Sequence, residues 1–352
     1  MGTATRLGSA LNGPLVSVEM LPGDGKEWLV LDPSISEPPQ EFLLMEGNLG
    51  IPHKILYKAY LEASLLFKTA RLALRSTTRS IDPSLAETVA QATAVIIVAN
   101  PGHQTAWNAR KRLLESGLLD PQRELSFTHA LLTVRYCAKH SLLWHHRRWL
   151  LRRLCPTRPA ASDAPPSTDG APDEDTLQHL DISPTQLRAE LDACTRAATT
   201  YERNYFAWAH RARCLDALAH CLREGAVRGF QDVLRDETAN VRLWIDRHVG
   251  DYTAMQYYCR LVLLARSPDS PSPPTSLSAY QHAKALVEAY PEHESLWCYL
   301  RSAASVEGVS GGDIRPFVEK VSQGTEVNPA TQTSLRHANS CLHWLRRQSP
   351  GS

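Results

Sequence analysis

The sequence predicts an all-α fold built from tandem helix hairpins, and three observations support this prediction. The first is a recurring pattern of Trp, then Arg three residues later, then Leu within six or seven residues of the Trp. At this spacing the three side chains share one face of a helix. The second is an apolar stripe before each pattern, with offsets of 0, 4, 7 and 11 that are typical of a helix. The third is a set of helix-start signals in front of two of these stripes.

Three segments carry the full pattern. Its Trp and Arg residues are Trp107 and Arg110, Trp144 and Arg147, and Trp208 and Arg211. The preceding stripes are Leu85, Val89, Ala92 and Ile96; Leu125, His129, Leu132 and Tyr136; and Leu187, Leu191, Cys194 and Ala198. Asp82 precedes a proline, and Ser183 stands three residues before Gln186 as in a capping box. Two weaker units follow around Met255 and Trp297, where the position three residues later is Tyr258 or Leu300.

Each Trp is expected to anchor the packing between neighbouring repeats, because a helix hairpin cannot bury its apolar face alone. These anchors are Trp107, Trp144, Trp208 and Trp297. An arginine one turn later can pack its aliphatic stem on apolar surface, and its guanidinium can then reach carbonyls or carboxylates of the next hairpin. Packing is therefore favoured for Arg110, Arg147 and Arg211, with direct ligand contact as the alternative.

The helical repeats do not fill the chain evenly. Helical patterning begins near Leu49, and five prolines and five acids favour disorder in an insert after the second repeat. The expected organisation is an irregular segment at 1–45 with a short strand at 28–31, an N-terminal helix and repeats 1–2 at 46–154, the insert at 155–176, and repeats 3–5 at 177–348 with a flexible break at 267–276.

Composition excludes several classes of protein. Lys and Arg total 38 against 37 Asp and Glu, so the formal charge is +1 and no basic face for nucleic acid is indicated. The eight cysteines form no C-x-x-C pair, and no cluster of zinc ligands is visible. The sequence has no run of 18 apolar residues, so it predicts no membrane-spanning helix. The expected location is the cytoplasm.

The third repeat carries the motif Asn-Tyr-x-x-Trp-x-x-Arg at residues 204–211. This motif resembles the repeat of protein prenyltransferase α subunits, and the resemblance covers roughly residues 80–300. It implies a right-handed α-α superhelix, a solenoid crescent that wraps a β subunit in a heterodimer. In that family the β subunit holds the catalytic zinc, so no cofactor is expected on this chain.

Within this family, the chain resembles a member that is similar to the α subunit of the type III protein geranylgeranyltransferase. This resemblance implies partnership with the β subunit of Rab geranylgeranyltransferase and geranylgeranyl diphosphate as the substrate. The acceptor would be a C-terminal cysteine of proteins of the SNARE or F-box type. The alternative is a helical-repeat scaffold that binds proteins without catalysis.

The resemblance also assigns roles to particular side chains. Lys139, five residues before Trp144, and Tyr205, three before Trp208, match the family positions that contact the diphosphate. A cation and an O–H donor would stabilise the charge that develops on this leaving group. Asn204, Arg147 and Arg211 are candidate substrate contacts in the same motifs. An ordinary solvated lysine and a packing tyrosine remain the alternatives for Lys139 and Tyr205.

Overall fold

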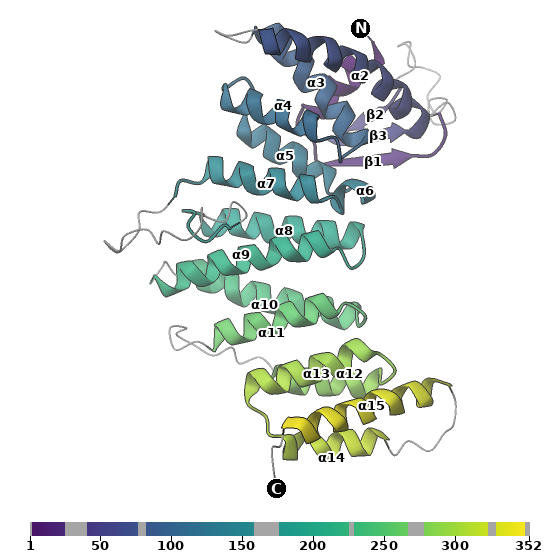
Figure 1. Cartoon of the computed structure of the whole chain (residues 1–352), viewed down its shortest axis with the longest axis vertical. Helices are drawn as coiled ribbons and strands as arrows, with labels where there is room; N and C mark the ends of the chain where they lie inside the picture. Colours follow the sequence, from purple (N-terminus) through teal and green to yellow (C-terminus); the bar gives the residue numbers. More distant parts are fainter. Residues whose placement is uncertain are drawn as a thin grey trace. The chain divides into compact units, whose positions relative to one another are not determined.

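The described residues are helical apart from one small sheet and short connections, in line with the predicted all-α class (Figure 1). The structure is a computed structural model that describes residues 2–24, 41–76, 82–157, 176–224, 229–266, 278–322 and 329–348. These residues form fifteen helices and three short strands. The chain divides into two compact units, Met1–Arg213 and Cys214–Ser352, with the boundary inside helix α9 (Tyr205–Arg223).

The N-terminal segment is ordered, so the prediction of irregular structure over 1–45 is wrong for its described part. Helix α1 (Thr3–Leu11) buries Leu7 and Leu11 and packs against helix α3 (Pro83–Ala99). Gly8 makes this close approach possible, because a Cβ there would lie 2.6 Å from the backbone oxygen of Gln91. The strand expected at 28–31 lies outside the described residues.

A three-stranded sheet follows α1. Strands β1 (Ser17–Leu21) and β2 (Leu43–Met45) flank β3 (Asn48–Pro52), which pairs parallel with β1 and antiparallel with β2. The β2–β3 turn has positive φ at both Glu46 and Gly47, as a type I′ hairpin requires. Leu49 therefore belongs to a strand. Helix α2 (His53–Ser76) starts only at His53, which corrects the start expected near Leu49.

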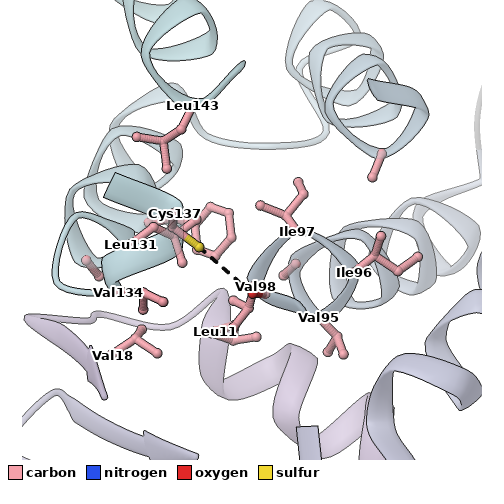
Figure 2. Packing of buried hydrophobic residues seen from close by; sticks show 14 of the residues in the cluster. Leu11, Val18, Val95, Ile96, Ile97, Val98, Leu131, Val134, Cys137 and Leu143 are labelled. Atoms are coloured by element: carbon pink, nitrogen blue, oxygen red, sulfur yellow. Dashed lines mark hydrogen bonds between the residues drawn. The ribbon is translucent and has the colours of Figure 1, made fainter. Parts of the chain in front are cut away.

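Helix α3 is the central helix of the first unit. It contacts α1, α2 and α4 (Gln104–Glu115), and its Ala- and Val-rich sequence is buried on nearly every side. Asp82 caps it from the predicted position, accepting a hydrogen bond from the backbone N–H of Ser84. Figure 2 shows the core beside this helix, where Val98 accepts a hydrogen bond from the thiol of Cys137.

The first helix of repeat 2 is interrupted, although its stripe predicts continuity to Tyr136. Helix α5 (Pro121–Leu131) stops and a short helix α6 (Arg135–Ala138) follows before α7 (Ser141–Leu154). The intervening Thr133 accepts a hydrogen bond from the N–H of Val18 and donates one to its carbonyl, at 2.9 and 2.7 Å. The break thus lies where the repeat is bonded to strand β1.

The insert predicted at 155–176 falls largely outside the described residues, but its ends are ordered. Cys155 is buried, and Thr157 forms an isolated bridge with Leu180. The chain then enters α8 (Pro184–Thr200), which begins with the predicted Ser183–Gln186 capping box.

The second unit contains three helix hairpins after the end of α9. They are α10 (Gly229–Arg247) with α11 (Tyr252–Ala265), α12 (Ala279–Ala289) with α13 (Glu294–Glu307), and α14 (Gly311–Ser322) with α15 (Pro329–Gln348). The first two correspond to the weak repeats around Met255 and Trp297. The third pair was not distinguished from repeat 5 in the sequence. The break predicted at 267–276 lies outside the described residues.

Candidate functional site

Trp side chains fix the turn before the second helix of a repeat. The indole N–H of Trp107 donates to the carbonyl of Pro101 at 2.8 Å, and Trp144 donates to Ala138 at 2.8 Å. Trp297 repeats this contact in the second unit with Pro291 at 2.7 Å. Trp208 is buried as well, with the guanidinium of Arg211 5.2 Å from its ring. These contacts give the four residues the anchoring role expected from the sequence.

Arg110 links its own repeat to the next one. Its guanidinium grips Glu124 of α5 through Nε at 2.8 Å and Nη2 at 2.5 Å, and Nη1 donates to the carbonyl of Ala90 at 2.8 Å. Both charged side chains are buried. The prediction that this arginine reaches a carboxylate of the following hairpin is therefore confirmed.

Arg147 repeats the arrangement one hairpin later. Its Nε and Nη2 donate to the two carboxylate oxygens of Glu190 in α8, each at 2.8 Å. Its Nη1 reaches Thr128 at 3.2 Å. The carboxylate partner lies 43 residues from its arginine, against 14 residues in the preceding pair, because the chain between repeats 2 and 3 is longer.

Each buried carboxylate also bonds to a histidine that sequence reasoning did not single out for this role. His146 Nε2 lies 2.8 Å from Glu124, and His210 Nε2 lies 2.9 Å from Glu190. Both histidines stand two residues after a repeat Trp, so the pattern Trp-x-His-Arg was the available signal. Both contacts join two helices, α7 with α5 for His146 and α9 with α8 for His210.

The electrostatics of these clusters are consistent in direction. Burial by itself raises the pKa of Glu124, but Arg110 and the hydrogen bond from His146 outweigh it and lower that pKa to about 2. Glu190 has a pKa of about 2 for the same reasons. Burial lowers the pKa of His146 and of His210, so each imidazole is neutral and donates its Nε2 hydrogen to the carboxylate.

The second unit keeps the geometry with different residues. Tyr257, two residues after Met255, donates to the buried Glu237 at 2.8 Å. Tyr299, two residues after Trp297, lies 3.1 Å from His282 Nδ1. A tyrosine thus replaces the histidine of the earlier repeats.

Lys139 and Tyr205 each follow a residue that takes part in one hydrogen bond between two repeats. The side chain of buried Asn204 donates to the carbonyl of Ala138 at 2.9 Å, and Lys139 comes directly after Ala138 while Tyr205 comes directly after Asn204. The same carbonyl accepts the indole N–H of Trp144. Tyr205 is 70% exposed and Lys139 is also exposed. The Asn204–Ala138 hydrogen bond thus joins the chain positions directly before these two exposed residues.

A second cation lies beside them. The Nζ of Lys139 is 5.0 Å from the ring centroid of Tyr201, and the guanidinium carbon of Arg135 is 5.3 Å from the same ring. Both basic residues are exposed. Two positive side chains above one ring make this surface suited to an anion.

The three remaining candidate substrate contacts are interior. Arg147 is 2% and Arg211 4% exposed, and Asn204 is 1% exposed. Arg147 is bonded to Glu190, Arg211 donates to Thr195 at 2.9 Å, and Asn204 caps α6. Their burial corrects the expectation of direct substrate contact and assigns them to positioning.

The described residues hold neither a cluster of metal ligands nor a helix suited to span a membrane. They contain no group of three His, Cys, Asp or Glu side chains that could hold a metal ion. None of their helices combines the length and apolar character needed to cross a bilayer.

Comparison with known proteins identifies the repeats. The family model of the protein prenyltransferase alpha subunit repeat matches residues 121–154 and 187–218, which contain repeats 2 and 3. Protein prenyltransferase alpha subunit repeat-containing protein 1 of Danio rerio is 29% identical over 61% of this chain and 54% of its own length. Its Homo sapiens counterpart is 26% identical over 74% of this chain and 67% of its own length.

Similarity extends to an enzyme subunit. The geranylgeranyl transferase type-2 subunit alpha of Mus musculus is 29% identical over 53% of this chain, although that match covers only 27% of the mouse protein. The match with the Danio rerio protein likewise spans about half of that relative. The matched repeats include Trp144, Arg147, Trp208 and Arg211, whose contacts build the hairpin stack. The chain is therefore similar to proteins of the protein prenyltransferase alpha subunit repeat family, whose repeat model it matches at residues 121–154 and 187–218.

Proposed function

We propose that this chain is the α subunit of a heterodimeric protein geranylgeranyltransferase of the type III kind. It would support a zinc-bearing β subunit and help transfer a geranylgeranyl group from its diphosphate to a C-terminal cysteine. The observation that carries the proposal is the joint exposure of Lys139 and Tyr205, fixed by the Asn204–Ala138 hydrogen bond.

The chemistry of this pair suits a diphosphate leaving group. When the bond between the prenyl carbon and the diphosphate oxygen breaks, negative charge grows on that oxygen. A lysine ammonium and a tyrosine O–H held at the site stabilise this charge more in the transition state than in the ground state. Arg135, above the same ring as Lys139, adds positive charge beside them.

The partner follows from similarity to the geranylgeranyl transferase type-2 subunit alpha. The β subunit of Rab geranylgeranyltransferase is the proposed partner. Zinc bound in that subunit would bind and activate the acceptor thiol. SNARE or F-box proteins that end in cysteine are the proposed acceptors, and the cytoplasm is the proposed location.

The direct test combines this chain with the Rab geranylgeranyltransferase β subunit. Co-expressed chains should co-purify and transfer labelled geranylgeranyl to an acceptor that ends in cysteine, whereas this chain alone should be inactive. If the two chains do not associate, the proposal fails. A stable heterodimer with no transfer to any such acceptor would favour the alternative, a non-catalytic scaffold.

Two substitutions with matched controls test the site itself. Lys139→Ala should lower kcat about tenfold to a hundredfold while the heterodimer persists. Lys284→Ala is its control, because the Nζ of Lys284 also lies 5.1 Å from an aromatic ring but in the second unit. If kcat is unchanged in Lys139→Ala, Lys139 is an ordinary solvated lysine with no role in the transfer.

Tyr205→Phe removes only the hydroxyl and should also lower kcat. Its control is Tyr252→Phe, since Tyr252 is likewise the first residue of its helix and is 62% exposed. Equal kcat values for the two tyrosine variants would remove Tyr205 from the site.

A further inference from the structure

Helix α2 presents an exposed apolar stripe along its outer face. Leu65 is 69% exposed, Tyr57 66%, Leu72 58% and Leu61 48%. Successive apolar residues in a soluble protein are rarely this exposed without a partner surface. The stripe runs from Tyr57 to Leu72, sixteen residues whose ends lie about 23 Å apart along the helix axis.

The same face carries lysines and no acid. At 100° per residue, Lys54 and Lys68 lie within about 25° of the stripe's centre and Lys58 lies about 55° from it, and all three are exposed. The one acidic residue of α2 is Glu62, which turns away and accepts a hydrogen bond from the backbone N–H of Ala4 at 3.0 Å. The opposite face, with Ala59, Ala63 and Phe67, is buried.

Neighbouring acids only partly offset this charge. Asp24 lies 3.8 Å from Lys54, and Glu41 lies 3.2 Å from Lys58 while it also pairs with Arg6. Lys68 pairs with no acid among the ion pairs of the described residues. The surface around the stripe therefore keeps a net positive charge.

We propose that the outer face of α2 docks on the surface of an anionic lipid bilayer. A stripe of Leu and Tyr interleaved with lysines suits an interfacial helix, whose apolar side chains enter the headgroup region while the long lysine side chains extend their ammonium groups to lipid phosphates. A protein partner is less compatible with this pattern, because the cores of protein interfaces are depleted in lysine. The proposal does not depend on the proposed transferase function.

Vesicle flotation of the full chain tests the proposal. Vesicles of phosphatidylcholine with 30% phosphatidylserine, roughly the anionic content that gives a strong surface potential, should carry the chain upward. Pure phosphatidylcholine should carry much less, and raised salt should reduce the binding. Equal binding to both vesicles, or no binding to the anionic ones, would overturn the proposal.

Substitutions assign the contact to α2. The double variant Leu61→Glu and Leu65→Glu should lower the partition coefficient more than about tenfold, and Lys68→Gln should lower it about fivefold. Leu243→Glu is the control, since Leu243 is 53% exposed but lies on α10. Because these residues are exposed, unfolding midpoints should stay unchanged.

Two outcomes would overturn the lipid proposal. One is vesicle binding that the double variant leaves intact, which would place the lipid contact elsewhere on the chain. The other is a chain that does not bind vesicles but self-associates, or binds the β subunit, through Leu61 and Leu65, as judged by sedimentation of the wild-type chain and the double variant.

Discussion

Glu190→Gln should destabilise the first unit strongly, although it only replaces one carboxylate oxygen with an amide NH2 group. Both oxygens of Glu190 accept hydrogen bonds from Arg147, and one lies 2.9 Å from His210. All three side chains are buried. The variant keeps the shape but places an amide NH2 against a guanidinium and leaves the positive charge of Arg147 without a counter-charge.

The magnitude follows from burial. Removing one partner of a fully buried ion pair costs about 3–5 kcal/mol, because the remaining charge keeps its desolvation penalty. A domain is stable by about 5–15 kcal/mol in total, so this loss is a large fraction. With a urea m-value of about 2–3 kcal/mol/M, the unfolding midpoint should fall by about 1–2 M.

Urea unfolding followed by far-UV circular dichroism measures this shift. Arg147→Met combined with Glu190→Gln should recover most of the loss, since the unpaired charge is gone and the amide oxygen can still accept from His210. The control is Arg153→Ala, which breaks the exposed pair with Glu115 at 2.9 Å and should cost less than about 1 kcal/mol.

The reasoning would be refuted by a Glu190→Gln variant as stable as Arg153→Ala. It would equally be refuted if the double variant were less stable than Glu190→Gln alone. The first result would mean that water reaches Arg147, and the second that the arginine stem, rather than its charge, dominates the packing.

Three further predictions concern the scaffold. Acid should destabilise the fold, because Glu190 contributes stability above its unfolded pKa of about 4.5 that is lost as the pH falls towards its folded pKa of about 2. The folded pKa of His210 is lowered, so protonation of this side chain below about pH 6.5 acts in the same direction. Melting temperatures should therefore fall steadily from pH 7 to pH 4. Trp144→Phe removes the hydrogen bond to the Ala138 carbonyl and part of a buried ring, and should cost about 2–3 kcal/mol in urea unfolding. Gly8→Ala should cost about 1–3 kcal/mol by pushing α1 from Gln91, measurable as a lower melting temperature.

The hairpin stack was predictable because its signals are local. A Trp and an Arg three residues apart share a helix face whatever surrounds them, and the caps at Asp82 and Ser183 follow from residues adjacent to the helix start. The identity of the carboxylate that each arginine meets was not predictable. Glu190 is 43 residues from Arg147, and nothing local marks it among the other acids.

The N-terminal structure escaped prediction for a different reason. Strand β1 pairs with β3 across 31 residues, as in Ser17 with Asn48, and each strand has at most five residues. Pairing over such distances leaves no periodic signal in either strand. Helix α1 is short, and Gly8 inside it weakens helix propensity while serving a close approach to α3.

The repeat motif and the candidate site meet at one backbone atom. The carbonyl oxygen of Ala138 accepts both the indole N–H of Trp144 and the amide of Asn204, and the next residue in the chain is Lys139. Since the motif arginines are occupied inside the stack, the side chains left for a ligand are those at the helix ends. The bonds that hold the hairpins together also fix the backbone beside Lys139 and Tyr205, so we expect a mutation of Trp144 or Asn204 to shift both positions.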